Sequence, residues 1–384
     1  MKRTLAVITT SRSDYTHLYW VLRELTSRPD IDLRLIAIGS HLSPEFGNTV
    51  QQIERDGFAV KGVECLLSSD TDIGMAKTIG LATLSLADLL GEIRPDLLLL
   101  IADRYELLAP ASVALALRIP VAHIEGGEIS EGAIDDAVRN ALTKLSHIHF
   151  TSTAGARARV IALGEDPARV HHVGAGSLDH LRRTKLLARE ELEKSLQLEF
   201  RNPVVLVGYH PVTVLRDTLA EADVLFAALR RVTGQLLFCY PNADAGSRAL
   251  IERTREFVAH RDGSHVFVNL NPITYWSLLS QSDLFIGNSS SGIIETASFA
   301  LPTVNVGIRQ RGREHGPNVL DAEPNVDSIL SCVKRVTSAP FREGLRGMQN
   351  PYGDGNAAGR IAGVLAETPI GEEFIIKKSH RRTE

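Results

Sequence analysis

Short runs of apolar residues alternate along this chain with longer segments in which apolar positions recur at helical spacing. The runs TLAVITT (4–10), LRLIAIG (33–39), DLLLLIA (96–102) and PVAHI (120–124) are rich in β-branched and aliphatic residues with few polar interruptions. Strands of this kind are buried on both faces, which is typical of a parallel sheet with helical crossovers. The pattern therefore predicts an α/β fold of doubly wound parallel sheets.

The alternation is interrupted once, near the middle of the chain. Residues 176–202 are charged and helix-prone without a strand pattern, and the apolar runs resume with VVLVGYH (204–210). We therefore expect two Rossmann-like domains that face a cleft, over residues 1–176 and 203–350. The glycine-rich NPYGDGNAAG then leads into a last helix, 355–367, that can cross back to the first domain.

The composition is that of an ordinary globular protein, and it narrows the range of partners. The 384 residues carry a formal net charge of −4, and 44% of them are apolar. No basic field is present to hold nucleic acid or an anionic membrane, so an acidic ligand must be held by local cations. No apolar run approaches the roughly 18 residues of a membrane span. We expect a cytoplasmic protein with no nucleic-acid or membrane partner.

Neither the cysteines nor most of the histidines indicate a metal site. The three cysteines lie far apart, without metal-ligand or redox spacing, which fits a reducing compartment. No metal spacing links the acidic residues to the histidines that lie on or beside short predicted strands, which are His147, His149, His171 and His172. We interpret these histidines as structural.

Polar segments follow the predicted strands at the point where each strand ends. They read TSRSDY, DRYE (103–106), HIEGGE, YHPVT (209–213) and GNSSSG (287–292). Open α/β sheets bind ligands in the crevice outside the carboxyl ends of their strands. Each segment alone could be an ordinary strand-to-helix loop, so their joint placement is what indicates a site.

The segment GNSSSGIIE (287–295) predicts an anion site. A strand runs into three serines and a glycine, and IIETASFA continues as a predicted helix, so free N–H groups and hydroxyls can bind phosphate there. The alternative is that Asn288 or Ser289 only caps the helix. Glu295, one turn further on, could hold a ribose diol or could be a solvated glutamate.

Arginines near this segment could complete the anion site. RQRGREHG (309–316) contributes Arg309, Arg311 and Arg313 directly after a predicted strand, and arginine forks suit phosphate oxygens. Arginine clusters are also common on surfaces. Arg12 follows the first strand and could reach the same anion.

Acidic residues crowd the segment that follows PVAHI. Glu125 lies at the strand end, and Asp135 and Asp136 occupy the predicted first turn of a helix, where negative charge is favourable in any case. Asp135 and Arg139 are spaced as an i,i+4 pair. Carboxylates in a closed site raise one another's pKa values, which can give one acid and one base near neutral pH. With Asp103 at the neighbouring strand end, we predict a proton-transfer centre.

These motifs together resemble the UDP-N-acetylglucosamine 2-epimerase family. The resemblance is carried by HIEGGEISEGAIDDAVRNALTKLSHIH, ADRYELLAP, GYHPVT and GNSSSGIIETASFALPTVNVGIRQRGRE, and it extends from the first strand to about residue 320. TSRSDY and YHPVT are similar to the branch of hydrolysing enzymes, which make N-acetylmannosamine for sialic acid synthesis. The resemblance implies a GT-B fold, and family members are usually homodimers or homotetramers.

The resemblance also implies roles for individual residues. It makes Asp103, Glu125 and Asp135 the catalytic carboxylates, with His210 beside the diphosphate, where a hydrogen-bonded structural histidine is the alternative. The implied nucleotide-binding positions are Arg12, Arg104, Asn242, Tyr275, Ser289, Ser290, Glu295, Arg309 and, from the same arginine loop, Arg313. Tyr275 would lie against uracil, although it could equally pack into the core as a helix residue.

The implied reaction converts UDP-N-acetylglucosamine and water to N-acetylmannosamine and UDP through a 2-acetamidoglucal, with no metal or redox cofactor. The loop GGEISEGAIDD is one residue longer than in some members. The alternatives are therefore the same chemistry on UDP-2,4-diacetamido-2,4,6-trideoxyglucose or a GDP sugar, as in legionaminic acid synthesis. A GT-B glycosyltransferase or a nucleotide-sugar sensor without turnover would share the phosphate site but would not need the acidic cluster.

Overall fold

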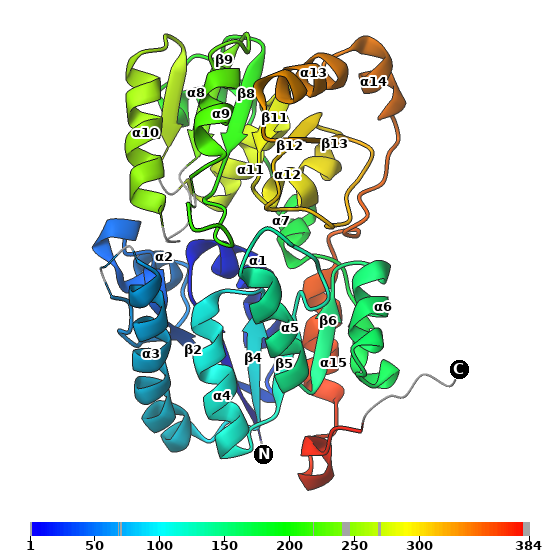
Figure 1. Cartoon of the computed structure of the whole chain (residues 1–384). Coiled ribbons are helices and arrows are strands. Elements are labelled where there is room, and N and C mark those ends of the chain that lie inside the picture. Colours follow the sequence, from blue (N-terminus) through cyan, green and yellow to red (C-terminus); the bar gives the residue numbers. More distant parts are fainter. Residues whose placement is uncertain are drawn as a thin grey trace. The chain divides into compact units, whose positions relative to one another are not determined.

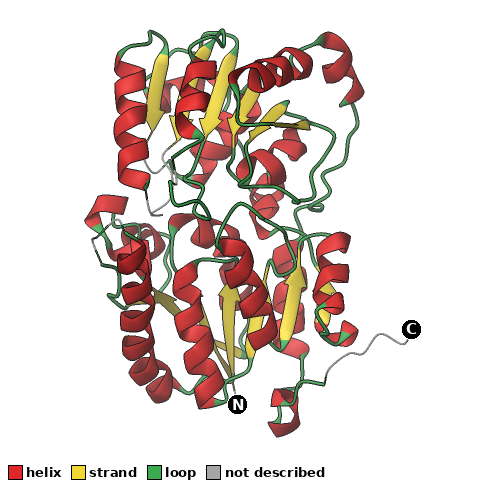
Figure 2. Ribbon diagram, in the orientation of Figure 1, coloured by secondary structure: helices red, strands yellow, loops and turns green. Residues whose placement is uncertain are grey.

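The chain forms two compact units, each built on its own parallel sheet (Figures 1 and 2). The computed structural model describes residues 2–67, 69, 71–217, 219–239, 246–267 and 270–378. The first unit consists of the chain up to Glu128, Asp135–Asp179 and the chain from Tyr352 onward, and the second unit of Ile129–Ile134 and His180–Pro351. The boundary near the middle of the chain falls inside the short helix α7 (Asp179–Arg183).

The first unit has a seven-stranded sheet in the order β3-β2-β1-β4-β5-β6-β7, and every neighbouring pair is parallel. The strands are β1 (Arg3–Thr9), β2 (Ile31–Ala37), β3 (Val60–Gly62), β4 (Leu97–Ile101), β5 (Val121–Ile124), β6 (Ile148–Thr151) and β7 (Val170–His172). The continuously apolar runs do form these buried strands. The α/β doubly wound prediction is therefore confirmed for this half of the chain.

Helices cover both faces of the first sheet. They are α1 (Arg12–Thr26), α2 (Val50–Arg55), α3 (Asp72–Ile93), α4 (Leu108–Leu117), α5 (Asp135–Leu145), α6 (Ala154–Ala162) and α15 (Ala357–Glu367). Because side chains alternate along a strand, Leu5 and Val7 pack in the core beside α1 and α15, while Ala6 and Ile8 pack in a second core beside α3 and α4. Two apolar layers therefore hold the sheet.

The second unit has a six-stranded parallel sheet in the order β10-β9-β8-β11-β12-β13. The strands are β8 (Val204–Gly208), β9 (Gln235–Cys239), β10 (Ser264–Phe267), β11 (Leu284–Gly287), β12 (Thr303–Val306) and β13 (Val319–Ala322). The last strand, VLDA, is absent from the sequence prediction, because its apolar pattern is short and Asp321 is exposed at the sheet edge.

The second unit's helices are α8 (Arg189–Leu196), α9 (Ala222–Leu229), α10 (Ser247–Ala259), α11 (Pro272–Gln281), α12 (Ser291–Ile294), α13 (Val326–Val336) and α14 (Ala339–Gly344). The segment before α8, expected to join two domains, packs within this unit. The backbone N–H of Leu187 donates to Ser277 Oγ of α11 at 2.9 Å. Each unit therefore has its own core, with Leu225, Ile286 and Val304 at the centre of the second.

The C-terminal helix α15 belongs to the first unit, where Figure 1 shows it in red. Its buried face, which includes Ile361 and Leu365, packs beside α1. The carboxylate of Asp179 accepts the backbone N–H groups of Ala357 at 2.8 Å and Ala358 at 3.3 Å, which satisfies two donors of the first turn. The chain therefore returns to the first sheet after passing through the second unit.

One helix of the first unit bears on the expectation about membrane spans, which stays a prediction. By length and composition alone, α3 is able to cross a membrane, and it is the one such helix in the described part of the chain. Lys77 and Asp88 interrupt its apolar run. In the structure α3 covers the sheet with Ala82, Leu86 and its neighbours, while Leu84 is 71% exposed.

We predict that Leu99→Ala in β4 lowers the free energy of unfolding by about 3 kcal/mol, because Leu99 is fully buried and the change leaves a cavity. The matched control, Leu84→Ala on the exposed side of α3, should change it by less than about 0.5 kcal/mol. Urea unfolding followed by circular dichroism measures both. Equal losses in the two variants would show that β4 is not a core strand.

Candidate functional site

Asp103 and Glu125 lie directly after β4 and β5, which are neighbouring strands of the first sheet. Ala102 and Glu125 have φ angles of 61° and 68°, in the left-handed region that non-glycine residues seldom adopt. The N–H of Ala102 donates to Ile124 O at 2.9 Å. The N–H of Glu125 donates to Phe150 O at 2.8 Å. Surrounding structure thus holds two strained turns, which is common at functional sites.

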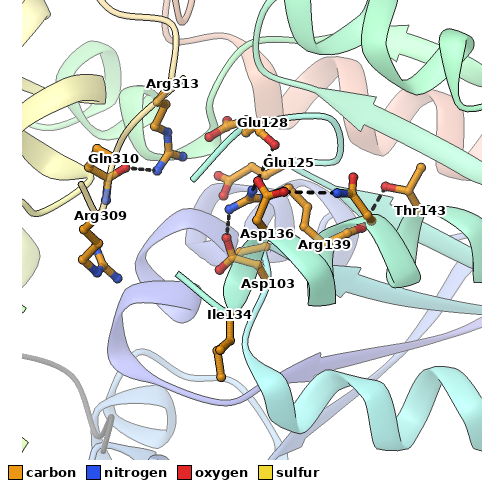
Figure 3. Close-up of polar contacts among 12 residues, drawn as sticks. Asp103, Glu125, Glu128, Ile134, Asp136, Arg139, Thr143, Arg309, Gln310 and Arg313 are labelled. Atoms are coloured by element: carbon orange, nitrogen blue, oxygen red, sulfur yellow. Dashed lines mark hydrogen bonds and ion pairs between the residues drawn. The ribbon is translucent and has the colours of Figure 1, made fainter. Parts of the chain in front are cut away.

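A buried arginine gathers the acidic residues. The Arg139 guanidinium of α5 is paired with Asp103, donates to Asp136 Oδ1 at 3.3 Å and donates to Glu128 O at 2.9 Å (Figure 3). Burial lowers the pKa of Arg139, but the charges of Asp103, Asp135 and Asp136 outweigh burial and raise it. The acidic cluster is therefore built around a cation. The sequence alone predicts, in contrast, a cluster of carboxylates that repel one another.

Glu125 has a different partner. His17 Nδ1 of α1 lies 2.6 Å from Glu125 Oε1, and the two side chains are only 17% and 6% exposed. His17 is not among the residues predicted from the sequence, because the two residues are 108 positions apart. The available signal is its position five residues after Arg12, on the helix that follows β1.

His123 of β5 lies beneath both strained turns. Its Nε2 is 2.7 Å from Ala102 O, so this nitrogen carries the hydrogen and donates to the turn that presents Asp103. Its Nδ1 faces Gly126 in the next turn, where an added Cβ would lie only 3.2 Å from it. Burial lowers the pKa of His123 to about 4, so the ring is neutral at pH 7.

The predicted arginines of the first unit have distinct surroundings. Arg104 is buried and donates to Glu106 Oε1 at 3.2 Å. Its charge also acts on Asp14, although burial is the larger effect and raises the pKa of Asp14 to about 6. Arg12 is the first residue of α1, which is capped by Ser11. Arg104 thus belongs to a buried ion pair, and Arg12 lies at a helix start.

In the second unit, Asn288 organises the predicted anion segment. Asn288 is fully buried; its Oδ1 accepts the N–H of His210 at 2.7 Å, and its Nδ2 donates to His210 O at 2.9 Å. The capping interpretation of Asn288 is therefore wrong, because its side chain bridges the ends of β8 and β11. The expected helix is also shorter, since α12 ends at Ile294 and a 3-10 turn follows.

The arginine loop is attached to the same asparagine. Arg309 Nη1 and Gln310 Nε2 donate to Asn288 O at 3.1 and 3.0 Å. Arg313 Nη1 donates to Gln310 Oε1 at 2.9 Å, as Figure 3 shows. Arg309 and Arg313 are only 8% and 9% exposed, whereas Arg311 faces solvent. Two of the three predicted arginines therefore extend inward beside the end of β11.

A glutamate that sequence analysis does not single out supports this loop. Glu221, at the start of α9, is buried and accepts the backbone N–H of Ile308, while burial raises the pKa of its carboxyl. Gly307 has a φ of 77°, and a Cβ there would lie 1.9 Å from Glu221 Oε2. The bend that begins the loop therefore requires glycine.

Six residues, Ile129–Ile134, leave the first unit and pack in the second; we name this segment the strap. The N–H of Glu131 donates to Arg311 O at 3.2 Å, and the N–H of Ile134 donates to Thr213 Oγ1 at 3.2 Å. At Gly132 an added Cβ would lie 2.3 Å from Ile308 O. The strap is thus fixed to the arginine loop through its backbone, and the side chains of Ile129 and Glu131 lie beside Gly312 of that loop.

The predicted site residues divide between the units. The first unit holds Arg12, Asp103, Arg104, Glu125 and Asp135, and the second holds His210, Tyr275, Ser289, Ser290, Glu295, Arg309 and Arg313. Asn242 lies outside the described residues. Tyr275 is half-buried on α11, while its neighbour Trp276 fills the core. Among the described residues, no group of three or more His, Cys, Asp or Glu could hold a metal ion.

Comparison with known proteins identifies relatives over nearly the whole chain. Residues 23–366 match the family model described as UDP-N-acetylglucosamine 2-epimerase. The chain is 35% identical to "UDP-N,N'-diacetylbacillosamine 2-epimerase (hydrolyzing)" of Legionella pneumophila, covering 98% of this chain and 99% of the relative. It is 33% identical to "GDP/UDP-N,N'-diacetylbacillosamine 2-epimerase (hydrolyzing)" of Campylobacter jejuni, over 89% of each chain. It is 30% identical to "UDP-N-acetylglucosamine 2-epimerase" of Neisseria meningitidis, over 88% of each.

Solved structures share the fold. The UDP-GlcNAc 2-epimerase of Methanocaldococcus jannaschii, in complex with UDP-GlcNAc and UDP, matches with a TM-score of 0.79 at 17% identity, covering 95% of this chain and all of that one. At this identity the likeness concerns the fold alone, and it confirms the GT-B-like prediction.

We predict that Gly132→Ala loosens the strap, because the new methyl group meets the backbone of Ile308 and Arg309. Hydrogen exchange at the Glu131 and Ile134 amides should accelerate at least about tenfold, since both amides lose a fixed acceptor. Gly80→Ala in α3 meets nothing within 4 Å and is the control, with unchanged exchange. Unchanged exchange in Gly132→Ala would show that the strap is not docked.

We predict that part of the acid sensitivity of folding comes from His123. The unfolded histidine titrates near 6.5, whereas the folded group has a pKa of about 4. The unfolded state therefore binds the proton first, so this stability is complete above pH 6.5 and is lost as pH falls toward 4. In urea titrations at pH 7 and pH 5, His123→Gln should lose less stability than wild type, by about 2 kcal/mol. The control variant, His172→Gln on β7, should lose as much stability between pH 7 and pH 5 as wild type. If His123→Gln also lost as much stability as wild type, His123 would not be a source of the acid sensitivity.

Proposed function

Because the chain belongs to the UDP-N-acetylglucosamine 2-epimerase family, we propose that it is a hydrolysing nucleotide-sugar 2-epimerase acting on UDP-N,N'-diacetylbacillosamine, a 2,4-diacetamido-2,4,6-trideoxy sugar. The products are UDP and the free sugar inverted at C2. The observation that carries the chemistry is the group of carboxylates at the ends of β4 and β5 and the start of α5, held by Arg139 and His17.

The choice of sugar rests on the relatives. The two that are 33% and 35% identical have names that specify the diacetamido sugar. The sequence alone favours UDP-N-acetylglucosamine over the diacetamido sugar. We propose the opposite order, with the diacetamido sugar first. The longer loop GGEISEGAIDD, which contains the strap, also supports the change, because an added residue beside the arginine loop alters the surroundings available to a sugar.

The proposed reaction is an elimination followed by addition of water. No carbonyl group activates the C2 proton, so its removal accompanies departure of UDP from C1 and leaves a double bond between C1 and C2. A carboxylate of the first unit accepts that proton. Water then adds its oxygen to C1 while a protonated group returns hydrogen to the opposite face of C2. The free sugar leaves with inverted C2.

The second unit is proposed to bind the nucleotide. Ser289, Ser290 and the adjoining backbone N–H groups suit the diphosphate, and Arg309 and Arg313 offset the charge that develops as it departs. Arg12, at the start of α1, is proposed as a further cation, and His210 is proposed to contact the diphosphate. Glu295 is proposed to bind the ribose diol, and Tyr275, half-buried on α11, to contact uracil.

UDP-N-acetylglucosamine is the second candidate, supported by the 30% identity to the enzyme of Neisseria meningitidis. A GDP-linked diacetamido sugar is the third, because the name of the Campylobacter jejuni relative includes both nucleotides. The chemistry is common to all three, so the group at C4, the group at C6 and the base distinguish them. A glycosyltransferase would bind similar nucleotides without exchanging the C2 hydrogen.

We predict that purified protein converts UDP-N,N'-diacetylbacillosamine in heavy water to UDP and the C2-inverted sugar, with deuterium at C2. Proton NMR should record the loss of the C2 proton signal along with the release of UDP. The same experiment with UDP-N-acetylglucosamine should give a kcat/KM at least about tenfold lower, equivalent to roughly 1.4 kcal/mol in the transition state.

Other outcomes reassign the substrate or the reaction. A higher kcat/KM on UDP-N-acetylglucosamine than on the diacetamido sugar would make the monoacetamido sugar the preferred substrate. Turnover of the GDP sugar alone would make GDP, rather than UDP, the nucleotide of the substrate. A UDP-linked product with inverted C2 would exclude hydrolysis. Absence of C2 exchange with every one of these sugars would contradict the epimerase proposal.

A further inference from the structure

Epimerisation by elimination needs two groups in opposite protonation states. One carboxylate must be ionised to accept the C2 proton, and another group must be protonated to supply hydrogen to the opposite face of C2. The predicted catalytic carboxylates therefore cannot be equivalent in the resting enzyme. Their hydrogen-bond partners in the first unit distinguish them, and this inference rests on the proposed function.

The aspartates are associated with fixed positive charge. Arg139 pairs with Asp103 and Asp136, and Asp135 contributes to the negative potential around the same guanidinium. Asp135 also occupies the first turn of α5, where the helix dipole stabilises negative charge. An ionised carboxylate is a proton acceptor only. These surroundings suit Asp135 to accept the C2 proton.

Glu125 is bonded to a group that can itself hold a proton. Its Oε1 lies 2.6 Å from His17 Nδ1, a short distance for this type of bond, and both side chains are largely excluded from solvent. Histidine is the side chain that exchanges a proton near neutral pH without unusual surroundings. A proton can therefore move along this bond without leaving the pair, whereas an arginine partner could not release one.

The left-handed turn at Glu125 restricts this carboxylate further. The backbone of Glu125 is held by its ladder bond to Phe150 O, and α1 carries His17 into contact with its side chain. An added Cβ at Gly176 would lie 2.5 Å from His17 O, so the backbone of α1 at His17 is closely packed. Both members of the pair are thus fixed from the backbone outward.

We propose that His17 is the positioning residue that stores the proton which Glu125 delivers to C2. In the addition step, Glu125 transfers its proton to C2 of the unsaturated sugar while His17 Nδ1 passes its own proton to Glu125. Water bonds to C1 and releases one proton, which returns through Glu125 to His17. Asp135 then releases to solvent the proton that it took from C2. The Glu125–His17 pair and Asp135 therefore return to the protonation states in which they began.

His17→Gln tests the proposal, because the amide keeps an N–H donor for Glu125 but stores no proton. We expect kcat to fall by about 10²- to 10⁴-fold, with KM changed by less than about threefold. Elimination should continue, so UDP and the 1,2-unsaturated diacetamido sugar should accumulate and show a vinylic H1 signal in proton NMR. The control, His172→Gln, replaces an exposed histidine of β7 and should behave as wild type.

Each other result would overturn the assignment. A His17→Gln variant with wild-type kcat would show that the pair stores no needed proton. Loss of turnover with intact substrate and no unsaturated sugar would place His17 in the elimination step. A rise in KM with unchanged kcat would make His17 a binding residue.

Two further measurements keep the test independent of folding and of the proposed function. If His17→Gln does not fold, Glu125→Gln should accumulate the same unsaturated sugar, and its failure to do so would contradict the proposal. Added imidazole should restore turnover to His17→Gly, since a diffusible base can occupy the emptied place; no rescue would count against proton storage. Wild-type protein that converts no substrate would instead refute the epimerase function.

Discussion

The buried guanidinium of Arg139 is the contact on which the rest of the first unit's site depends. A buried charge costs several kcal/mol unless it is paired and hydrogen-bonded. Arg139 meets this condition with the end of β4 at Asp103, the last residue before the strap at Glu128 and the first turn of α5 at Asp136. The end of β4, which is 36 residues away, and the two ends of the strap therefore have to be in place before the cation is satisfied. The density of acidic residues in this part of the chain follows from that requirement.

Much of the fold is predictable from the sequence, because strands buried on both faces must be apolar throughout. The runs at 96–102 and 204–210 contain β4 and β8 for this reason. The prediction fails where tertiary contacts replace local pattern. β13 is four residues long and is completed by its register with β12. The helix expected after GNSSSG is only α12, since a 3-10 turn follows Ile294, and Asn288 forms bonds to His210 rather than capping a helix.

The candidate site is predictable only in part. Asp103 and Glu125 are found because the topology of a parallel sheet brings polar residues to one edge, whatever the details of packing. His17, His123 and Glu221 act through partners 108, 21 and 87 positions away, so no local pattern reveals them. Arg139 is visible in the sequence, but its burial is not, and burial changes the cluster from mutually repelling acids to an ordered set of ion pairs.

The strap is held in place differently from the carboxylates that flank it. Backbone hydrogen bonds and the absence of a side chain at Gly132 hold the strap to the arginine loop, and the side chains of Ile129 and Glu131 pack beside Gly312 of that loop. Its ends are different, since Glu128 O is bound by Arg139 and Asp135 begins α5. The carboxylates are thus constrained by buried charge, while the adjoining loop is constrained by backbone hydrogen bonds and close packing. Because loops vary more readily than the elements they connect, we expect substrate differences within the family to arise in this loop.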